Sequence, residues 1–461
     1  MDSDEHTALK ILKQIRKAGF SAFFAGGSVR DKLLGRIAKD YDIATSATPD
    51  QIEALFPKTV AVGKAFGVIV VVQDGTETEV ATFRADGGYQ DGRRPDSIHF
   101  CGAEEDAKRR DFTVNGMFYD PLEDKVIDYV GGQVDLEKKI IRAIGDPEKR
   151  FSEDHLRMLR AVRFAHTLGF EIERATRAAI KKFAPDIAKI SAERIENEFS
   201  RTLTESIKPG DALKDLVDLG LMAHIIPEIL PMIGQEQPPE FHPEGDVFVH
   251  TCLMLNLMKN RDADTLAFGK WQTGASAPQL QNTPPNFNKL LAYTALLHDV
   301  GKPATAFMGA DRLRFHGHER KSAEMAEEIL RRLKLPSKEI KQIVTAVDGH
   351  MRFKDVQKMN KSTLRKLMGA ETFDLELELH RVDCSGSHGL LDNYHFLLAK
   401  AEEMKNEPIL PERWVTGKDL RELGVAPGPR MGELIQLAYD AQLEGRFPDR
   451  DALLVWLKTQ I

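Results

Sequence analysis

The stretch KDYDIAT, residues 39–45, sets two aspartates two positions apart. In a β-strand alternate side chains share a face, so Asp40 and Asp42 would project together. Carboxylates this close repel each other unless a divalent cation binds both, and Mg²⁺ usually takes one or two carboxylates together with substrate phosphates. The pair is a candidate metal site for phosphoryl or nucleotidyl chemistry. The alternative is a solvated turn with two acids, because a two-residue pattern is weakly specific.

A glycine turn precedes this pair. AGGSVRDKLLG places Gly26 and Gly27 before Ser28, which we expect to cap a helix. A glycine turn that leads into a helix exposes backbone N–H groups to phosphate. Downstream, Glu79 would supply a third carboxylate from the second arm of a hairpin, or be an ordinary exposed strand residue. These residues predict a phosphate cradle followed by a metal pair.

Two further stretches are rich in arginine. In KRRDFTVNGMFY, Arg109 and Arg110 would bind ribose and phosphate oxygens, which suit guanidinium groups, or form a solvated charge run. In SEDHLRMLRAVRFA, Asp154 and Arg157 stand three positions apart, so on one helix they would be neighbours. Such a pair is also explained as a helix N-terminal carboxylate with an ion pair three residues on.

The functional interpretation of this second pair uses base chemistry. Cytosine and adenine both offer an amino donor beside a ring-nitrogen acceptor, and guanine and uracil present the reverse pattern. Asp154 would accept from the amino group while Arg157 donates to the ring nitrogen. By analogy with readout in duplexes, such contacts discriminate by about 1–3 kcal/mol each. The pair therefore predicts selection of C and A by the protein itself.

Composition restricts the class of protein. A chain of 461 residues predicts about three domains, and 42% hydrophobic with 29% charged residues is typical of soluble globular proteins. The N-terminus is polar and acidic, and no stretch approaches the roughly 18 apolar residues of a membrane span. Three distant cysteines indicate a reducing compartment, so we predict a cytoplasmic protein. A net charge of −7 still permits basic residues gathered in one groove.

Local patterns predict the elements that position these residues. GVIVVVQDGTETEVATFR reads as a hairpin that turns at Asp74 and Gly75, whereas EDHLRMLRAVRFAHTLGF is helical. A loop rich in Pro and Gly near 232–246 marks a domain boundary. We predict four parts: a mixed α/β part over 1–145, a helical part over 146–231, a second helical part over 232–400 and a helical tail over 401–461.

A second set of candidate ligands lies in the helical half. LLHDVGKP sets His298 beside Asp299, which alone would be a satisfied core pair. Further ligand-type residues lie on separate helical segments, His250 upstream and His318, His350 and Asp383 downstream. His316 is a competing candidate to His318. Six such donors fit metal-assisted phosphoester hydrolysis.

The ordered motifs GGSVRDKLLG, KDYDIAT, FRADGGYQDGRRPDSIHF, RRDFTVNGM and EDHLRMLRAVRFA resemble those of the class II tRNA nucleotidyltransferase/poly(A) polymerase family over about residues 22–200. The resemblance implies an α+β fold: a polymerase-beta-like head with a mixed sheet, then an all-helical neck and body. It implies these site residues: Asp40 and Asp42 as Mg²⁺ ligands, Gly27, Arg30 and Arg110 at phosphate or ribose, Asp154 and Arg157 at the base, and Arg160 and Arg163 nearby.

Residues 245–390 resemble the HD superfamily of metal phosphohydrolases. The resemblance implies His250, His298, Asp299 and Asp383 as primary ligands, with His318 and His350 completing a second metal position. Imidazole and carboxylate donors suit Mn²⁺, Ni²⁺, Fe or Zn²⁺, and Mg²⁺ stays an alternative, so the sequence leaves this metal open.

The two resemblances together imply a template-independent CTP/ATP:tRNA nucleotidyltransferase that builds or repairs the 3′-terminal CCA. Its partners would be the tRNA 3′ end, CTP and ATP, without a membrane, and no oligomeric state is predicted. RADGGYQDGRR resembles the flexible loop of enzymes that complete the A step. The alternatives are a poly(A) polymerase or A-only enzyme, and an HD phosphohydrolase with an RNA-binding head. GVAPGPRMG in the tail would contact phosphate or form a tight helical connection.

Overall fold

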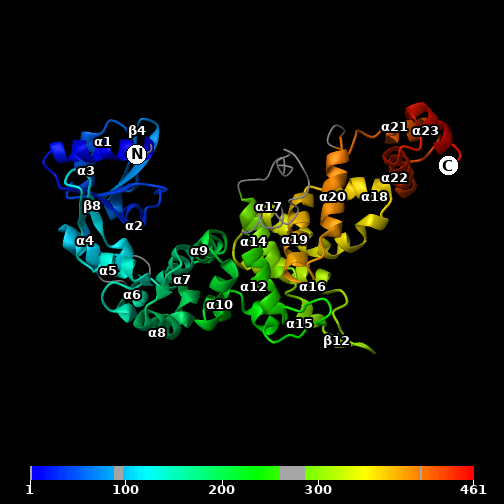
Figure 1. Ribbon diagram of the computed structural model, residues 1–461. Coiled ribbons are helices and arrows are strands. Elements are labelled where there is room, and N and C mark those ends of the chain that lie inside the picture. Colours follow the sequence, from blue (N-terminus) through cyan, green and yellow to red (C-terminus); the bar gives the residue numbers. More distant parts are fainter. Residues whose placement is uncertain (1–2, 88–96, 259–285, 405–407) are drawn as a thin grey trace, which may run out of the picture. The chain divides into compact units, whose positions relative to one another are not determined.

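The computed structural model describes residues 3–87, 97–258, 286–404 and 408–461. The chain forms two compact units, Met1–Leu230 and Pro231–Ile461, which are coloured blue to green and green to red in Figure 1. The finer division into four parts remains a proposal. Among the described residues, no helix has the length and apolar character that crossing a membrane requires.

The head is built on a mixed sheet of seven strands, in the order β3-β4-β5-β2-β1-β8-β9. Within it only β2 and β5 run parallel, and Ile43 lies beside Val80 in their register. The predicted hairpin is confirmed, because Asp74 and Gly75 both have positive φ between β4 and β5. The strands of this sheet are β1 (Ala22–Ala25), β2 (Asp42–Thr45), β3 (Thr59–Gly63), β4 (Val68–Gln73), β5 (Thr76–Thr82), β8 (Phe118–Asp120) and β9 (Lys125–Ile127).

Short strand pairs and helices complete this unit. Helix α1 buries Ala8, Ile11, Leu12 and Ile15, which share one face at helical spacing. The helices are α1 (Ser3–Lys17), α2 (Gly27–Leu33), α3 (Pro49–Leu55), α4 (Ala103–Arg109), α5 (Gly132–Glu137), α6 (Pro147–Glu153), α7 (Arg157–Leu168), α8 (Arg174–Phe183), α9 (Ala192–Glu205), α10 (Pro209–Asp218) and α11 (Met222–Ile225). The remaining strands are β6 (Arg84–Asp86) with β7 (Ile98–Phe100) and β10 (Ile140–Ile141) with β11 (Glu171–Ile172), and the 3₁₀ turns are η1 (Lys64–Phe66), η2 (Thr113–Asn115), η3 (Ala184–Lys189) and η4 (Pro227–Met232).

The prediction of one helix through Asp154 and Arg157 is wrong. Helix α6 ends at Glu153, Asp154 has extended backbone angles (φ −145°, ψ 104°), and α7 begins at Arg157. The Asp154 carboxylate accepts from the backbone N–H of Leu156 at 3.1 Å, a local hydrogen bond that competes with helix formation. Asp154 therefore lies at a junction between two helices.

An ion-pair cluster ties α7 and α8 to α10. Asp215 accepts from His166 at 3.1 Å and from Arg177. Burial would raise the pKa of Asp215, but His166 and Arg177 outweigh it and lower the pKa to about 2. A lowered aspartate pKa contributes stability that is present above the unfolded pKa near 4 and is lost as pH falls towards 2.

Asp215→Asn should therefore lower the free energy of unfolding at pH 7 by about 2 kcal/mol, and the deficit should shrink below pH 4. Urea unfolding at pH 7 and pH 3 measures both. The matched control is Asp218→Asn on the same helix, whose exposed side chain should change stability by less than about 0.5 kcal/mol. An equal deficit at both pH values would contradict the assignment.

The described part of the second unit is helical except for one small hairpin, β12 (Phe307–Met308) with β13 (Leu313–Arg314). Its helices are α12 (Val247–Leu257), α14 (Phe287–Leu297), α15 (Lys302–Thr305), α16 (His318–Arg332), α17 (Ser337–Gly349), α18 (Lys361–Met368), α19 (Phe373–Gly386), α20 (Asp392–Glu403), α21 (Gly417–Glu422), α22 (Pro429–Glu444) and α23 (Arg450–Leu457), with η5 (His350–Lys358). One apolar core gathers around Phe353 and Leu377, and another around Leu434 and Leu453.

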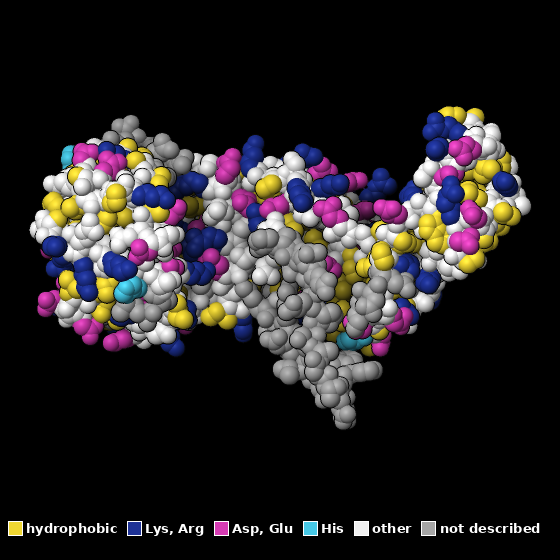
Figure 2. All heavy atoms as spheres, turned by 90° about the horizontal axis from the view of Figure 1, so that it is seen from above, with side chains coloured by type: hydrophobic (Ala, Val, Ile, Leu, Met, Phe, Trp, Pro, Cys, Tyr) yellow, Lys and Arg dark blue, Asp and Glu magenta, His cyan; other side chains and the backbone are white. Residues whose placement is uncertain are grey.

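The predicted loop RADGGYQDGRR falls partly outside the described residues, beyond Gly87. On the face shown in Figure 2, basic and acidic side chains are interspersed. This view therefore shows no single-sign surface, in keeping with the net charge of −7.

Candidate functional site

Three carboxylates lie in one region of the head sheet. Asp42 opens β2, and the parallel register with β5 places it beside Glu79, while Asp40 precedes the strand. Burial raises the pKa of Asp42, Glu79 and Asp40 add to this and Arg110 opposes it, giving a value of about 7. Glu79, whose role the sequence left open, is thus a close neighbour of Asp42. A cluster of negative charge of this kind is where a divalent cation would be favourable.

The head carboxylates are not gathered as tightly as a closed ligand set. Within the described residues, the groups of three potential ligands whose donor atoms all lie within 4.8 Å of one another are found in the second unit. The metal-binding roles of Asp40 and Asp42 therefore stay predictions that rest on the shared position of their charges.

Arg110 lies over the glycine turn. Gly26 has φ +69°, and a Cβ there would stand 3.3 Å from Nη1 of Arg110, so glycine suits this position twice over. The same guanidinium donates to Asp106 at 3.1 and 3.2 Å. The expected cap is wrong: Gly26 occupies the N-cap of α2, and Ser28 donates from within the first turn to the carbonyl of Ala25 at 3.0 Å.

Asn115 links Arg30 and Arg110, the two arginines beside this turn. Arg30 donates to its side-chain oxygen at 2.7 Å, and Arg110 to its backbone carbonyl at 3.4 Å. Arg109 pairs with Asp106 at 2.7 Å. Sequence reasoning did not single out Asn115 or Asp106. Both lie in or beside the stretch KRRDFTVNGMFY that carries the arginines, and Asn115 precedes a glycine, which would have been the available signal.

The predicted base-reading residues are brought to one region without pairing with each other. Asp154 is bound by Arg194 at 3.1 and 3.3 Å. Arg157 is buried and donates to Glu153 at 2.9 Å and to the backbone carbonyl of Arg109 at 3.3 Å. Arg157 thus binds the segment that precedes Arg110, and each of the two residues predicted to read the base has its own partner.

The other two arginines of α7 have structural partners. Arg160 donates to Asp111 at 2.6 and 2.9 Å, which joins α7 to the segment after Arg110. Arg163 is only 3% exposed and pairs with buried Glu198 of α9. A nucleotide contact stays a prediction for Arg160, and the burial of Arg163 argues against one there.

The six predicted ligands of the second unit converge from five helices or helix ends. One group of three consists of His250 of α12, His298 at the end of α14 and Asp383 of α19. Within it, Nε2 of His250 lies 3.0 Å from Oδ1 of Asp383. Asp299, His318 and His350 form the other, with 3.3 Å between His318 Nε2 and Asp299 Oδ1. Asp299 also contacts His298 at 3.0 Å, so the two groups adjoin.

Backbone carbonyls fix the tautomers of three imidazoles. Nδ1 of His298, His318 and His350 lies 2.9, 2.8 and 2.7 Å from the carbonyl three residues earlier. Each Nδ1 therefore donates, and Nε2 is left with its lone pair towards Asp299 or a neighbouring imidazole. This is the arrangement in which second-sphere partners orient metal-binding histidines.

Nε2 of His318 and Nε2 of His350 lie 3.2 Å apart. Two lone pairs at this distance repel unless a cation or a proton lies between them. Burial, with neighbouring His298 and His318, lowers the pKa of His350 to about 4, while Asp299 outweighs burial and raises that of His318. Nε2 of His298 and Oδ1 of Asp299 are buried and lack a hydrogen bond among the described residues. These donors fit a metal ion.

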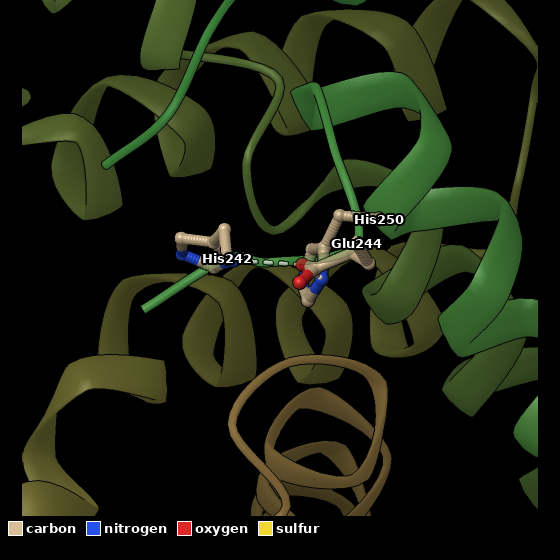
Figure 3. Close-up of side chains that lie close together, drawn as sticks. All are labelled: His242, Glu244 and His250. Atoms are coloured by element: carbon tan, nitrogen blue, oxygen red, sulfur yellow. Dashed lines mark hydrogen bonds and ion pairs between the residues drawn. The ribbon is translucent and has the colours of Figure 1, made fainter. Parts of the chain in front are cut away.

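Two residues that sequence reasoning missed adjoin this cluster. Figure 3 shows Glu244 between the imidazoles of His242 and His250. Its Oε1 is 2.9 Å from Nδ1 of His242 and 2.6 Å from Nδ1 of His250. Burial would lower the pKa of His250, but Asp383 and Glu244 raise it to about 9. The available signal was a His and a Glu two apart, just before the Asp246 cap of α12.

The structure also decides between His316 and His318. His318 is buried in the cluster, whereas His316 is exposed and contacts the Phe307 ring, with 5.2 Å between the ring centroids. Lys302 is buried and binds Asp299 at 2.7 Å. A Cβ at Gly301 would lie 2.6 Å from the backbone nitrogen of Ser322, which explains the glycine of HDVGK by close packing against α16.

Three domain families match this chain. Residues 22–142 match the family described as poly A polymerase head domain, residues 169–233 the probable RNA and SrmB-binding site of polymerase A, and residues 271–381 the HD domain. The resemblance expected from the motifs, and the α+β head followed by helical parts and an HD domain, are confirmed.

Relatives with an assigned activity match about half of this chain. The chain is 48% identical over 219 residues to the CCA-adding enzyme of Geobacillus thermodenitrificans, covering 47% of this chain and 54% of that protein. The CCA-adding enzyme of Latilactobacillus sakei is 48% identical over 215 residues, covering 46% and 54%. In each case the match spans about half the length of the relative.

Solved structures match along the whole chain. The Bacillus stearothermophilus CCA-adding enzyme in complex with CTP aligns with 100% of this chain and 98% of its own, with a TM-score of 0.73 and 29% identity. The Thermotoga maritima CCA-adding enzyme complexed with tRNA is 18% identical with a TM-score of 0.57, covering 98% of this chain and 94% of its own, and shows the fold alone.

Proposed function

We propose that this chain, whose first half carries a poly A polymerase head and whose second half carries an HD domain, is a template-independent CTP/ATP:tRNA nucleotidyltransferase that builds or repairs the 3′-terminal CCA. The observation that carries the proposal is that Glu79, Asp40 and Arg110 lie near enough to Asp42 to act on the charge of its carboxylate. Three acids and one arginine next to a glycine turn suit a nucleoside triphosphate with its metal. The curated relatives that match about half of this chain are CCA-adding enzymes.

In this proposal Asp40 and Asp42 hold Mg²⁺, which supplies the Lewis acidity for attack by the RNA 3′-hydroxyl and for release of pyrophosphate. Arg110 and Arg30 bind phosphate or ribose oxygens beside Gly27, and Asn115 keeps the two guanidinium groups in place. Asp106 leaves Arg110 anchored on one side, so its orientation is set before the nucleotide binds.

Base selection falls to Asp154 and Arg157. The carboxylate accepts from the amino group of cytosine or adenine, and the guanidinium donates to the ring nitrogen. Glu153 and the Arg109 carbonyl hold Arg157, which limits the rotation of the guanidinium. Guanine and uracil would place a carbonyl against Asp154 and are rejected.

A second activity is favoured by the HD cluster. We propose that His250, His298, Asp299 and Asp383 bind a transition metal or Mg²⁺, with His318 and His350 at a second position, and that the bound metal supports hydrolysis of RNA 3′-terminal phosphates. This would restore the free 3′-hydroxyl that the head needs. The alternative that the chain is primarily a phosphohydrolase is disfavoured by the complete set of residues in the head.

The decisive experiment offers labelled CTP, ATP, GTP and UTP with Mg²⁺ to tRNAs that lack CCA, end in the first C, or end in CC. We expect addition of C, C and A in order, without use of GTP or UTP. Repeated A addition to any RNA would support a poly(A) polymerase, and A addition to the CC end alone would support an A-only enzyme. Absence of transfer to every substrate would overturn the proposal.

A further inference from the structure

Asp154 is held by an arginine from another helix. Nη2 of Arg194, in the first turn of α9, lies 3.1 Å from one carboxylate oxygen and 3.3 Å from the other. One nitrogen facing both oxygens fixes the rotation of the carboxylate as well as its position. Among the described residues, Asp154 is the side chain to which Arg194 donates, and Nη1 of Arg194 is buried without a partner there.

The position of Asp154 makes this contact important. The residue lies between the end of α6 and the start of α7, with extended backbone angles, so it is outside both helices. Besides the hydrogen bonds from Arg194, the Asp154 carboxylate accepts one from the backbone N–H of Leu156. A side chain at a helix junction has more rotational freedom than one inside a helix, and the ion pair removes it.

Helix α9, which carries Arg194, is itself fixed to α7. One turn beyond Arg194, buried Glu198 pairs with buried Arg163 of α7. The Arg194 guanidinium is therefore supported by a helix whose place relative to α7 is set by a buried ion pair. Arg157 has a different support, Glu153 at 2.9 Å. The two base-reading groups are thus positioned by separate charges on separate elements.

We infer that Arg194 is a positioning residue for base selection, acting through Asp154. The inference rests on the proposed nucleotidyl transfer. Arg194 binds both oxygens of the Asp154 carboxylate, and the lone pairs that remain accept from the amino group of cytosine or adenine. Without Arg194 it would rotate, so the amino contact weakens, and the carbonyl of guanine or uracil meets less repulsion.

The test measures kcat and KM for all four nucleotides in Arg194→Met. We expect KM for CTP and ATP to rise about tenfold with kcat within about threefold, and the relative use of GTP or UTP to rise at least about fivefold. Arg194→Lys, which keeps the charge and one donor, should lie between wild type and Arg194→Met. The matched control is Arg201→Met on the same helix, because Arg201 is 44% exposed, pairs with Glu205 at 3.2 Å and should leave selection unchanged.

A second variant separates positioning from a general effect on the fold. In the Asp154→Ala background, Arg194→Met should change selection no further, because its effect passes through Asp154. The inference is overturned if Arg194→Met keeps the wild-type selection among the four nucleotides, if Arg201→Met changes it equally, or if the effect persists without Asp154. In each of those cases the wild-type protein still adds C and A, so the proposed function stands. A wild-type protein that adds neither nucleotide would instead overturn the proposed function.

Discussion

Replacing Asp42 by asparagine should abolish the addition of C and A to tRNA. Asparagine keeps the shape of the side chain and removes the charge that would hold the metal. The same reasoning applies to Asp40→Asn. Loss of a catalytic metal costs several kcal/mol, so turnover should fall by about 1,000-fold or more in both variants. Single-turnover addition to a tRNA that ends in CC, at saturating ATP and Mg²⁺, measures the effect.

The stability of the Asp42→Asn variant provides an independent readout. Burial, Glu79 and Asp40 raise the pKa of Asp42 to about 7, so in the absence of metal the ionised carboxylate destabilises the head as pH rises from about 4 through 7. At pH 8 with a chelator, Asp42→Asn should therefore be more stable than wild type, by about 4 kcal/mol. Below pH 4 the difference should vanish. An inactive variant that is less stable at pH 8 would indicate a damaged fold instead.

The matched control for both aspartates is Glu77→Gln. Glu77 is exposed on β5, two residues before Glu79, and should be replaceable with activity near that of wild type. Glu79→Gln then tests the third carboxylate, and a loss similar to that of Asp42→Asn would make it part of the metal site. Turnover of Asp40→Asn and Asp42→Asn within about tenfold of wild type would contradict the metal role.

His298→Ala should remove metal-dependent hydrolysis of an RNA 3′-phosphate or 2′,3′-cyclic phosphate and spare nucleotide addition to an intact tRNA end. His298 belongs to one group of three donors and contacts Asp299 of the other. The two activities use different side chains without a shared ligand, so their losses should be independent. We expect hydrolysis to fall at least about 1,000-fold, with addition within about twofold of wild type.

Metal binding gives a readout besides activity. Calorimetric titration of wild type with Mn²⁺ or Ni²⁺ should show binding, and metal at about 100 times Kd should raise the free energy of unfolding by about 2.7 kcal/mol. His298→Ala should lose the binding and the stabilisation. The control His316→Ala should keep both, because His316 is exposed and packs against Phe307 outside the cluster.

Two outcomes would contradict the hydrolase proposal in different ways. A wild-type protein without hydrolysis in Mn²⁺, Ni²⁺, Co²⁺ and Mg²⁺ would exclude it. A His298→Ala protein that melts early and loses both activities would indicate that the metal holds the helices together instead of acting on RNA. The backbone hydrogen bonds of His318 and His350 predict a site formed before metal binds, which favours a wild-type fold for His298→Ala.

Much of the fold and of the candidate site was predictable from short stretches of sequence. The Asp74 and Gly75 turn, the buried face of α1 and the aspartate pair at β2 depend on backbone preferences and side-chain spacing within a few residues. The same holds for the residue types in the HD cluster, since carboxylates and imidazoles are ligands wherever the chain brings them together. These features depend on neighbouring residues, so a single sequence is enough to predict them.

Tertiary packing decided the rest. The parallel register of β2 and β5 brings Glu79 to Asp42 across the hairpin of β4 and β5, and no periodicity within either strand specifies that pairing. The helix break at Asp154 went unpredicted because helical spacing continues through it, while a local hydrogen bond and the pairing with Arg194 stabilise the junction. His318 was expected as a ligand with His316 as its competitor, and only packing buries His318 in the cluster. The place of Glu244 beside His250 was hidden, because an ion pair depends on elements that packing brings together.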